Sequence, residues 1–235
     1  MKVIGLIPTI GVEQSPMPYI VPPALLPITY FIKDGQKCVK PILQVAIEGM
    51  VLARVDEVSF IINENNMAVM RYFRDGAYFG LPFSYFWQKA KYLPASIDSC
   101  YHVLKGNTVV MTLPGILEID QIGSVLSHHI EGTHMSMSVG VNATLDEYGG
   151  ITTGKNLQHL GVYAWGPEFT DYIHDQVTQN STITFTKLLE NAVQDKMVIR
   201  ALKFESCGYV ASATSWVERL GIPDIDPPFQ VEDFG

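Results

Sequence analysis

The loop after the first predicted strand is the first place where the chain offers residues for chemistry. An apolar run over residues 2–8 is followed by Thr9 and Gly11, a pattern typical of a buried strand that turns into a loop. A glycine there would let backbone N–H groups approach a phosphate, and cationic side chains would strengthen such binding. Glu13 instead supplies a carboxylate, which at about 4 Å would repel a phosphate by about 4 kcal/mol at an effective dielectric constant of about 20. If Glu13 points into the loop, the loop is a poor site for a triphosphate.

The other titratable side chains form no recognisable catalytic or metal-binding motif. His128, His129 and His134 lack the H-x-x-x-H spacing with which a helix presents two zinc ligands, so we interpret them as surface residues at a helix end. Glu168 and Asp171 have the i,i+3 spacing of a solvated helix face. No serine lies in a nucleophile elbow, and no cysteine has a convincing histidine partner. These residues predict no replacement active site.

Composition places the chain among globular proteins with few surface charges. Its 235 residues suit one α/β domain, and 47% of them are hydrophobic against 17% charged. Such a low charged fraction leaves room for an apolar surface patch that binds a partner, although a large hydrophobic core explains the composition equally well. A net charge of −8 argues against nucleic acid or an anionic membrane as a partner. Cys38, Cys100 and Cys207 are too scattered for a disulfide framework or a zinc site, and no signal peptide is evident, so we expect a cytoplasmic protein.

Segments with the periods of strands and helices alternate along the chain. The predicted strands are 2–8, 56–62, 83–88, 107–113, 134–144, 160–165, 198–205 and 208–211, and the predicted helices are 40–53, a part of 63–76, 97–104, 122–131, 168–177 and 185–193. This order predicts a single three-layer α/β/α domain over 1–235, with a Rossmann-like, doubly wound, mostly parallel (mixed) sheet and an extended tail over 222–235. We expect Trp87, Trp165 and Trp216 to anchor its core. Ligands of such sheets bind beyond the carboxyl ends of the strands.

Several segments also follow the order of conserved blocks in one enzyme family. They are residues 2–11, 22–28, 40–41, 55–57, 72–80, 85–88, 165–170 and 208–209. Together they resemble the sugar-1-phosphate nucleotidyltransferases, the family of glucose-1-phosphate thymidylyltransferase, and they cover most of the chain. The resemblance implies a fold of the nucleotide-diphospho-sugar transferase type and a site for a nucleoside triphosphate, a sugar phosphate and Mg²⁺.

The phosphate-binding residues of that family are replaced in this chain. The family opens with G-x-G-T-R and continues with P-K-x-L-L-P-I. Here Gly11 is kept, whereas Glu13, Gln14 and Ser15 stand in place of Gly, Thr and Arg, and Pro23 stands in place of Lys. The loss of two cationic side chains removes charge-assisted hydrogen bonds to phosphate.

Both aspartates that hold Mg²⁺ in the family are replaced as well. The first lies in an L-P-D-x-L-F block, where this chain has Gly115, and the second lies in a G-Y-x-x-D-x-G-T block, where the matching residue is Ala211. Neither replacement can bind a metal ion through its side chain. Glu118 and Asp120 are nearby acids that would have to act as shifted ligands.

Four residues are kept as candidates for ligand binding. Gln88 matches a glutamine with which the family reads the edge of a pyrimidine, since an amide both donates and accepts, but it would serve equally well as a strand-end cap. Lys155 lies near the place of a lysine that holds the sugar phosphate, and a solvated loop lysine is the alternative. Thr9 and Gly11 complete the set.

These replacements predict a catalytically degenerate homologue, a pseudoenzyme that binds a partner or a sugar- or nucleotide-like ligand, with no catalytic residue and no cofactor. The alternative is a divergent active nucleotidyltransferase that makes an NDP-sugar or a similar metabolite with Mg²⁺, and a third possibility is a purely structural partner. We expect a homo-oligomer or a complex with an active relative. Its surface would include the aromatic residues Tyr78, Phe79, Phe83 and Tyr85, unless they belong to the core.

Overall fold

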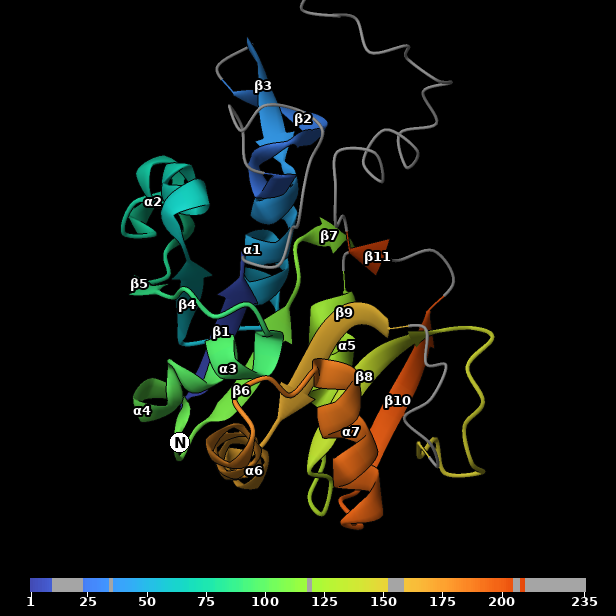
Figure 1. Cartoon of the computed structure of the whole chain (residues 1–235). Helices are drawn as coiled ribbons and strands as arrows, with labels where there is room; N and C mark the ends of the chain where they lie inside the picture. Colours follow the sequence, from blue (N-terminus) through green and yellow to red (C-terminus); the bar gives the residue numbers. More distant parts are fainter. Residues whose placement is uncertain (10–22, 34–35, 118–119, 152–158, 205–207, 210–235) are drawn as a thin grey trace, which may run out of the picture.

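A seven-stranded sheet forms the centre of the molecule (Figure 1). The computed structural model describes residues 1–9, 23–33, 36–117, 120–151, 159–204 and 208–209. The sheet has the strand order β10-β8-β9-β6-β1-β4-β5. Its strands are β1 (Val3–Pro8), β4 (Glu57–Ile62), β5 (Phe83–Trp87), β6 (Thr108–Thr112), β8 (Met135–Gly140), β9 (His159–Trp165) and β10 (Ile199–Phe204). Neighbours are parallel except that β9 runs antiparallel to β6 and β8, which confirms the predicted mixed, mostly parallel α/β sheet.

Helices cover both faces of this sheet and give the predicted three layers (Figure 1). One face carries α1 (Ile42–Leu52), α2 (Met67–Phe73) and α5 (Gln121–His128). The other carries α3 (Leu93–Asp98), α4 (Tyr101–Leu104), α6 (Pro167–Gln179) and α7 (Phe185–Gln194). Because both faces are covered, the central strands are apolar on both sides. No helix in the described ranges has the length and hydrophobicity needed to cross a membrane.

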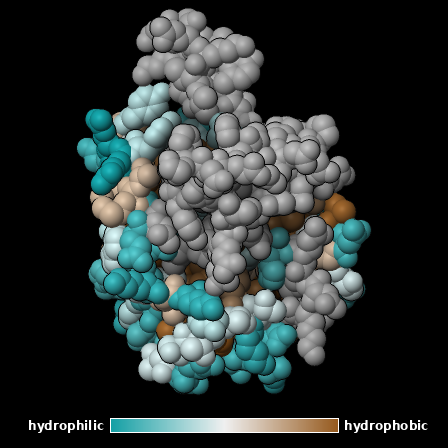
Figure 2. Space-filling model, turned by 45° about the horizontal axis from the view of Figure 1, so that its top comes forward, coloured by the Kyte–Doolittle hydropathy of each residue, from teal (hydrophilic) through white to brown (hydrophobic). Residues whose placement is uncertain are grey.

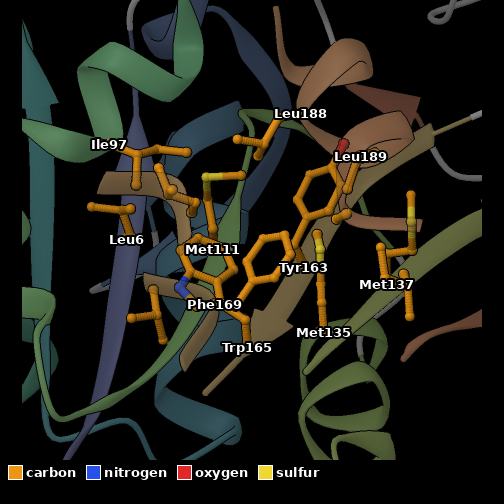
Figure 3. Close-up of a cluster of buried hydrophobic side chains, with 14 of the residues drawn as sticks. Leu6, Ile97, Met111, Met135, Met137, Tyr163, Trp165, Phe169, Leu188 and Leu189 are labelled. Atoms are coloured by element: carbon orange, nitrogen blue, oxygen red, sulfur yellow. The ribbon is translucent and has the colours of Figure 1, made fainter. Parts of the chain in front are cut away.

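Strand β1 lies in the interior of the sheet between β4 and β6, as predicted. Successive side chains of a strand point to opposite faces, so Ile4 and Leu6 enter one core whereas Ile7 enters the other. Figure 3 shows the first core, in which Leu6 meets side chains from other strands and from helices. On the second face Gly5 lies against α1, since an added Cβ would come within 3.1 Å of Met50 Sδ. The sheet and α1 are therefore in close contact.

Several elements differ from the prediction. The hairpin of β2 (Pro27–Lys33) and β3 (Gln36–Pro41) was not predicted. The first helix begins at Ile42 rather than at residue 40, because Pro41 is extended, with φ −71° and ψ 156°, and ends β3. The predicted helix over 97–104 is divided between α3 and α4. Short 3₁₀ helices also appear, namely η1 (Pro23–Leu25), η2 (Glu64–Asn66) and η3 (Ala77–Phe79).

The tryptophans do not share one role. Trp165 is fully buried, and its Nε1–H donates a hydrogen bond to Thr170 Oγ1 at 3.0 Å, which confirms it as a core residue. Trp87 is 49% exposed, so its predicted core role is wrong. The reason is that β5 is an edge strand of the sheet, where a side chain has neighbours on one side only. Trp216 and the tail over 222–235 lie outside the described residues.

Candidate functional site

The carboxyl ends of six strands, all except β9, lie at one edge of the sheet, which we call the carboxyl edge. Thr9 follows β1 there, and Gln88 follows β5. A small ribbon of β7 (Gly115–Ile116) and β11 (Gly208–Tyr209) lies beyond β6 on the same side (Figure 1). Figure 2 turns this side toward the viewer, and its described surface is mainly hydrophilic, with scattered hydrophobic residues. Ligands of doubly wound sheets bind at such an edge, so this is the candidate site.

Thr9 is buried, and its polar groups serve the fold. Its hydroxyl donates to the carbonyl oxygen of Ile61 at 2.9 Å, and its backbone N–H donates to the same oxygen at 3.0 Å. Its own carbonyl oxygen accepts from Asn66 Nδ2 at 2.6 Å. These bonds hold the start of the loop against the end of β4. Asn66, also buried, was missed in the sequence because a lone asparagine carries no motif.

The side-chain amide of Gln88 is engaged by the local backbone. Its Oε1 accepts from the N–H groups of Lys89 at 2.6 Å and Ala90 at 2.9 Å, and its Nε2 donates to the carbonyl oxygen of Ala95 at 3.1 Å. The Gln88 N–H also extends the sheet by donating to Ile62 at 2.9 Å. An amide has one acceptor oxygen and two N–H donors, so one N–H is left for a ligand by these bonds. This geometry favours a role for Gln88 as a strand-end cap over a role in binding a pyrimidine.

The segments that match the two metal-binding blocks of the family lie side by side. Strand β7 pairs antiparallel with β11, with Gly115 opposite Tyr209 and Ile116 opposite Gly208. Residues more than 90 positions apart are thereby brought to one place, as a two-aspartate metal site requires. At Gly115 that place has no side chain.

The described residues near this edge offer no set of metal ligands. No group of three or more His, Cys, Asp or Glu side chains able to hold a metal ion is found in the described part of the chain. Asp120 is exposed at the start of α5. Lys40, which precedes α1, pairs with Glu48 at 2.7 Å, so its charge is matched within the protein.

Two further groups that could act in chemistry are held in the neutral form. Burial, with a smaller contribution from Asp75, raises the pKa of Tyr85 to about 12, and the Tyr85 hydroxyl donates to the carbonyl oxygen of Arg74 at 2.6 Å. Burial raises the pKa of the Cys100 thiol to about 11, which disfavours the nucleophilic thiolate. Neither is therefore a candidate nucleophile or general base at neutral pH.

The remaining predicted site residues lie outside the description. They are Gly11, Glu13, Ser15, Lys155 and Ala211, as well as the acid Glu118. Pro23 begins η1, and only its backbone is described. The repulsion of a phosphate by Glu13 therefore stays a prediction.

Among the comparisons with known proteins, only the one with solved structures gives matches to this chain. No protein-family model and no curated protein sequence matches the chain. A Bacillus anthracis protein assigned as a glucose-1-phosphate thymidylyltransferase, in complex with a sucrose, is 16% identical, with a TM-score of 0.70 and 96% of each chain covered. UDP-glucose pyrophosphorylase complexed with UDP-glucose is 17% identical, with a TM-score of 0.69 and coverage of 94% of this chain and 98% of that one. The apo form of such an enzyme gives 16% identity, the same TM-score, and coverage of 94% and 97%. The chain therefore has the fold of the sugar-1-phosphate nucleotidyltransferases.

Proposed function

We propose that this protein is a catalytically degenerate homologue of the sugar-1-phosphate nucleotidyltransferases that acts by binding. The observation that supports this most is the pairing of β7 with β11, because it brings Gly115, which the resemblance aligns with the first metal-binding aspartate, beside the start of the block aligned with the second. Mg²⁺ is a hard cation that takes oxygen ligands, and glycine supplies none from a side chain. Ala211, at the second position, supplies none either.

The hydrogen bonds of Gln88 support the same proposal. To present its oxygen to a base, this side chain would have to give up two hydrogen bonds from backbone N–H groups. Each such bond contributes about 0.5–1.5 kcal/mol net, which would be subtracted from the binding energy of a nucleotide. A ligand that needs neither Mg²⁺ nor this base contact fits the site better. We propose a sugar-like or nucleotide-like ligand, or a protein partner.

The alternative is a divergent active nucleotidyltransferase. The structure of an enzyme complexed with UDP-glucose matches 94% of this chain, so nearly all of the backbone around such a pocket has a counterpart here. This coverage favours the alternative. Such an activity would require Mg²⁺ bound through residues other than Gly115 and Ala211, and it would make an NDP-sugar or a similar activated metabolite.

A calorimetric titration with UTP or dTTP, with and without Mg²⁺, separates these functions when combined with an assay of pyrophosphate release from each triphosphate and glucose 1-phosphate. We expect no magnesium-dependent binding and no pyrophosphate. Micromolar, magnesium-dependent affinity would require about 8 kcal/mol and would contradict the proposal. The matched control restores five positions together, as E13G, S15R, P23K, G115D and A211D, and we expect this variant to gain magnesium-dependent binding of a triphosphate. If it gains none, the replaced residues are not what prevents binding.

Association is the second part of this proposal. Tyr72 and Tyr78 are 54% and 67% exposed, whereas Phe79, Phe83 and Tyr85 are half-buried beside them. We propose that this aromatic surface contributes to a homo-oligomer or to a complex with an active relative, with a main interface of more than about 1,200 Å². Light scattering across micromolar concentrations tests it. A monomeric mass at every concentration, with no stable partner recovered from the native host, would contradict it.

A further inference from the structure

A pocket lies at the edge of the sheet opposite the candidate site, where the parallel strands begin. Its volume is about 680 Å³, and Val3 at the start of β1 and Thr108 at the start of β6 line it. Strand β9 runs antiparallel to these strands, so its end and the start of α6 reach the same place. In Figure 1 this edge carries the N-terminus, whereas β7 and β11 lie at the far end of the molecule. The volume suits a small organic ligand, and the pocket is distinct from the candidate site.

The segment between α5 and β8 supplies most of the polar wall. His134 Nδ1 accepts a hydrogen bond from the backbone N–H of Val198 at 2.9 Å. A backbone N–H can only donate, so Nδ1 is the acceptor in this bond. The other ring nitrogen, Nε2, faces Glu168 Oε2 at 3.4 Å. The interpretation of these histidines as surface residues is corrected, since His129 and His134 are half-buried and line the pocket.

Two polar atoms of this wall have no hydrogen-bond partner among the described residues. Thr133 is 8% exposed, and its Oγ1 is buried and unpartnered. His129 Nδ1 is also buried without a partner. Most buried polar groups in proteins are hydrogen-bonded, but these two atoms are buried within the protein, so they lie behind the surface of the pocket and other atoms of Thr133 and His129 line it. Burial, and to a smaller extent His134, lower the pKa of His129, which favours the neutral imidazole at this residue.

The charges and apolar groups of the wall define the kind of ligand. Val3, Leu126 and Ile130 give an apolar surface. Glu131 and Glu168 are exposed carboxylates that also line the pocket. Glu168 lies in the first turn of α6, so a carboxylate already occupies the end of the helix that attracts anions. The wall therefore disfavours a phosphate or a carboxylate and favours a cation with an apolar body.

We propose that this pocket binds a small organic amine, with the ammonium group near Glu131 and Glu168 and the apolar body against Val3, Leu126 and Ile130. This site does not depend on the proposed function, because it lies at the other edge of the sheet and uses other residues.

Three probes of one shape test the proposal. Benzylamine, benzyl alcohol and benzoate are titrated at neutral pH while the ring C–H signals of His129 and His134 are followed by NMR, with each signal assigned by a His→Gln variant. We expect saturable shifts with benzylamine that are larger and tighter than with benzyl alcohol, and no saturable shift with benzoate. Absence of any saturable shift would overturn the pocket as a binding site. Benzoate or benzyl alcohol binding as tightly as benzylamine would overturn the amine as its ligand.

Substitution of the two carboxylates tests whether they bind the ammonium group of the ligand. The double variant E131Q and E168Q should weaken benzylamine binding about fivefold, in the range expected for the loss of exposed ion pairs, without changing that of benzyl alcohol. Glu147 is exposed and does not line the pocket, so E147Q is the matched control and should leave both unchanged. Equal benzylamine affinity in the double variant and the wild type would show that these carboxylates do not hold the ligand.

Discussion

The two edges of the central sheet use their polar side chains in different ways. At the carboxyl edge, Thr9 and Gln88 direct their hydrogen bonds to the backbone, and Gly115 stands where the family resemblance leads us to expect a metal-binding aspartate. At the edge where the parallel strands begin, Thr133 and His129 keep buried polar atoms without partners in the described protein. The comparison teaches that a side chain in the right place is available for a ligand only if the fold has not already used its donors and acceptors.

Alanine substitution of the two described tryptophans, one at each edge, should give the largest difference in the free energy of unfolding. Trp165 ends β9 at the pocket edge and is fully buried, so Trp165→Ala should lower the free energy of unfolding by about 3–5 kcal/mol through the cavity it leaves. Trp87 ends β5 at the carboxyl edge and is 49% exposed, so Trp87→Ala should cost about 1 kcal/mol or less. Urea denaturation of both variants measures the difference. Equal losses would mean that Trp87 is covered in solution, which would support an interface over β5.

Two asparagines test whether hydrogen bonds hold the candidate site together. Asn66→Ala removes the 2.6 Å bond to the Thr9 carbonyl in a buried setting, and it should lower the free energy of unfolding by about 1–3 kcal/mol. Asn107 bonds the backbone of Lys2 and Val103 at the other edge, each at 3.1 Å and with more exposure, so Asn107→Ala should cost about 0.5–1.5 kcal/mol. Thermal and urea unfolding give both values. A smaller loss for Asn66→Ala than for Asn107→Ala would contradict the role of Asn66 as the anchor of the first loop.

Substitutions of Gln88 distinguish its role as a strand-end cap from a role in binding a pyrimidine base. Gln88→Met removes the acceptor of two backbone N–H groups and should cost about 1 kcal/mol of stability, whereas Gln88→Glu keeps that acceptor and should cost less. If Gln88 reads a pyrimidine, both variants should instead lose affinity for uridine nucleotides while stability stays unchanged. Unfolding curves together with a UDP-glucose titration distinguish the two results.

Substitution of two half-buried histidines, one near each edge, should give the smallest effect on stability. Burial lowers the pKa of His129 and of His159 in the folded protein below the ordinary value of 6.5. Below pH 6.5 the unfolded chain therefore binds more protons, and the free energy of unfolding should fall as the pH is lowered through this value. His129→Gln and His159→Gln should each make this fall less steep, as measured by urea denaturation at several pH values. An unchanged slope in both variants would show that neither imidazole is buried in the neutral form.

Local sequence patterns were sufficient to predict most of the strands and helices of the central sheet and its two covering layers. The apolar run over residues 2–8 predicted an interior strand, and β1 has this position because a strand buried on both faces needs apolar side chains on both. The period of a helix likewise predicted α6 and α7 to within a few residues. The order of the family-like blocks predicted the fold that the solved structures share.

Patterns confined to one segment failed where a neighbour distant in sequence decides the outcome. The exposure of Trp87 depends on β5 being an edge strand, which only the strand order determines. Strands β7 and β11 have two residues each, too few for any periodicity, and they exist because their backbones pair with one another. The meeting of His134 with Glu168 likewise joins two residues that are far apart in the sequence. Residue types and their spacing thus determined which side chains this protein can offer, whereas the tertiary structure decided which donors and acceptors are left, because each polar group bonds whatever the fold brings within about 3 Å of it.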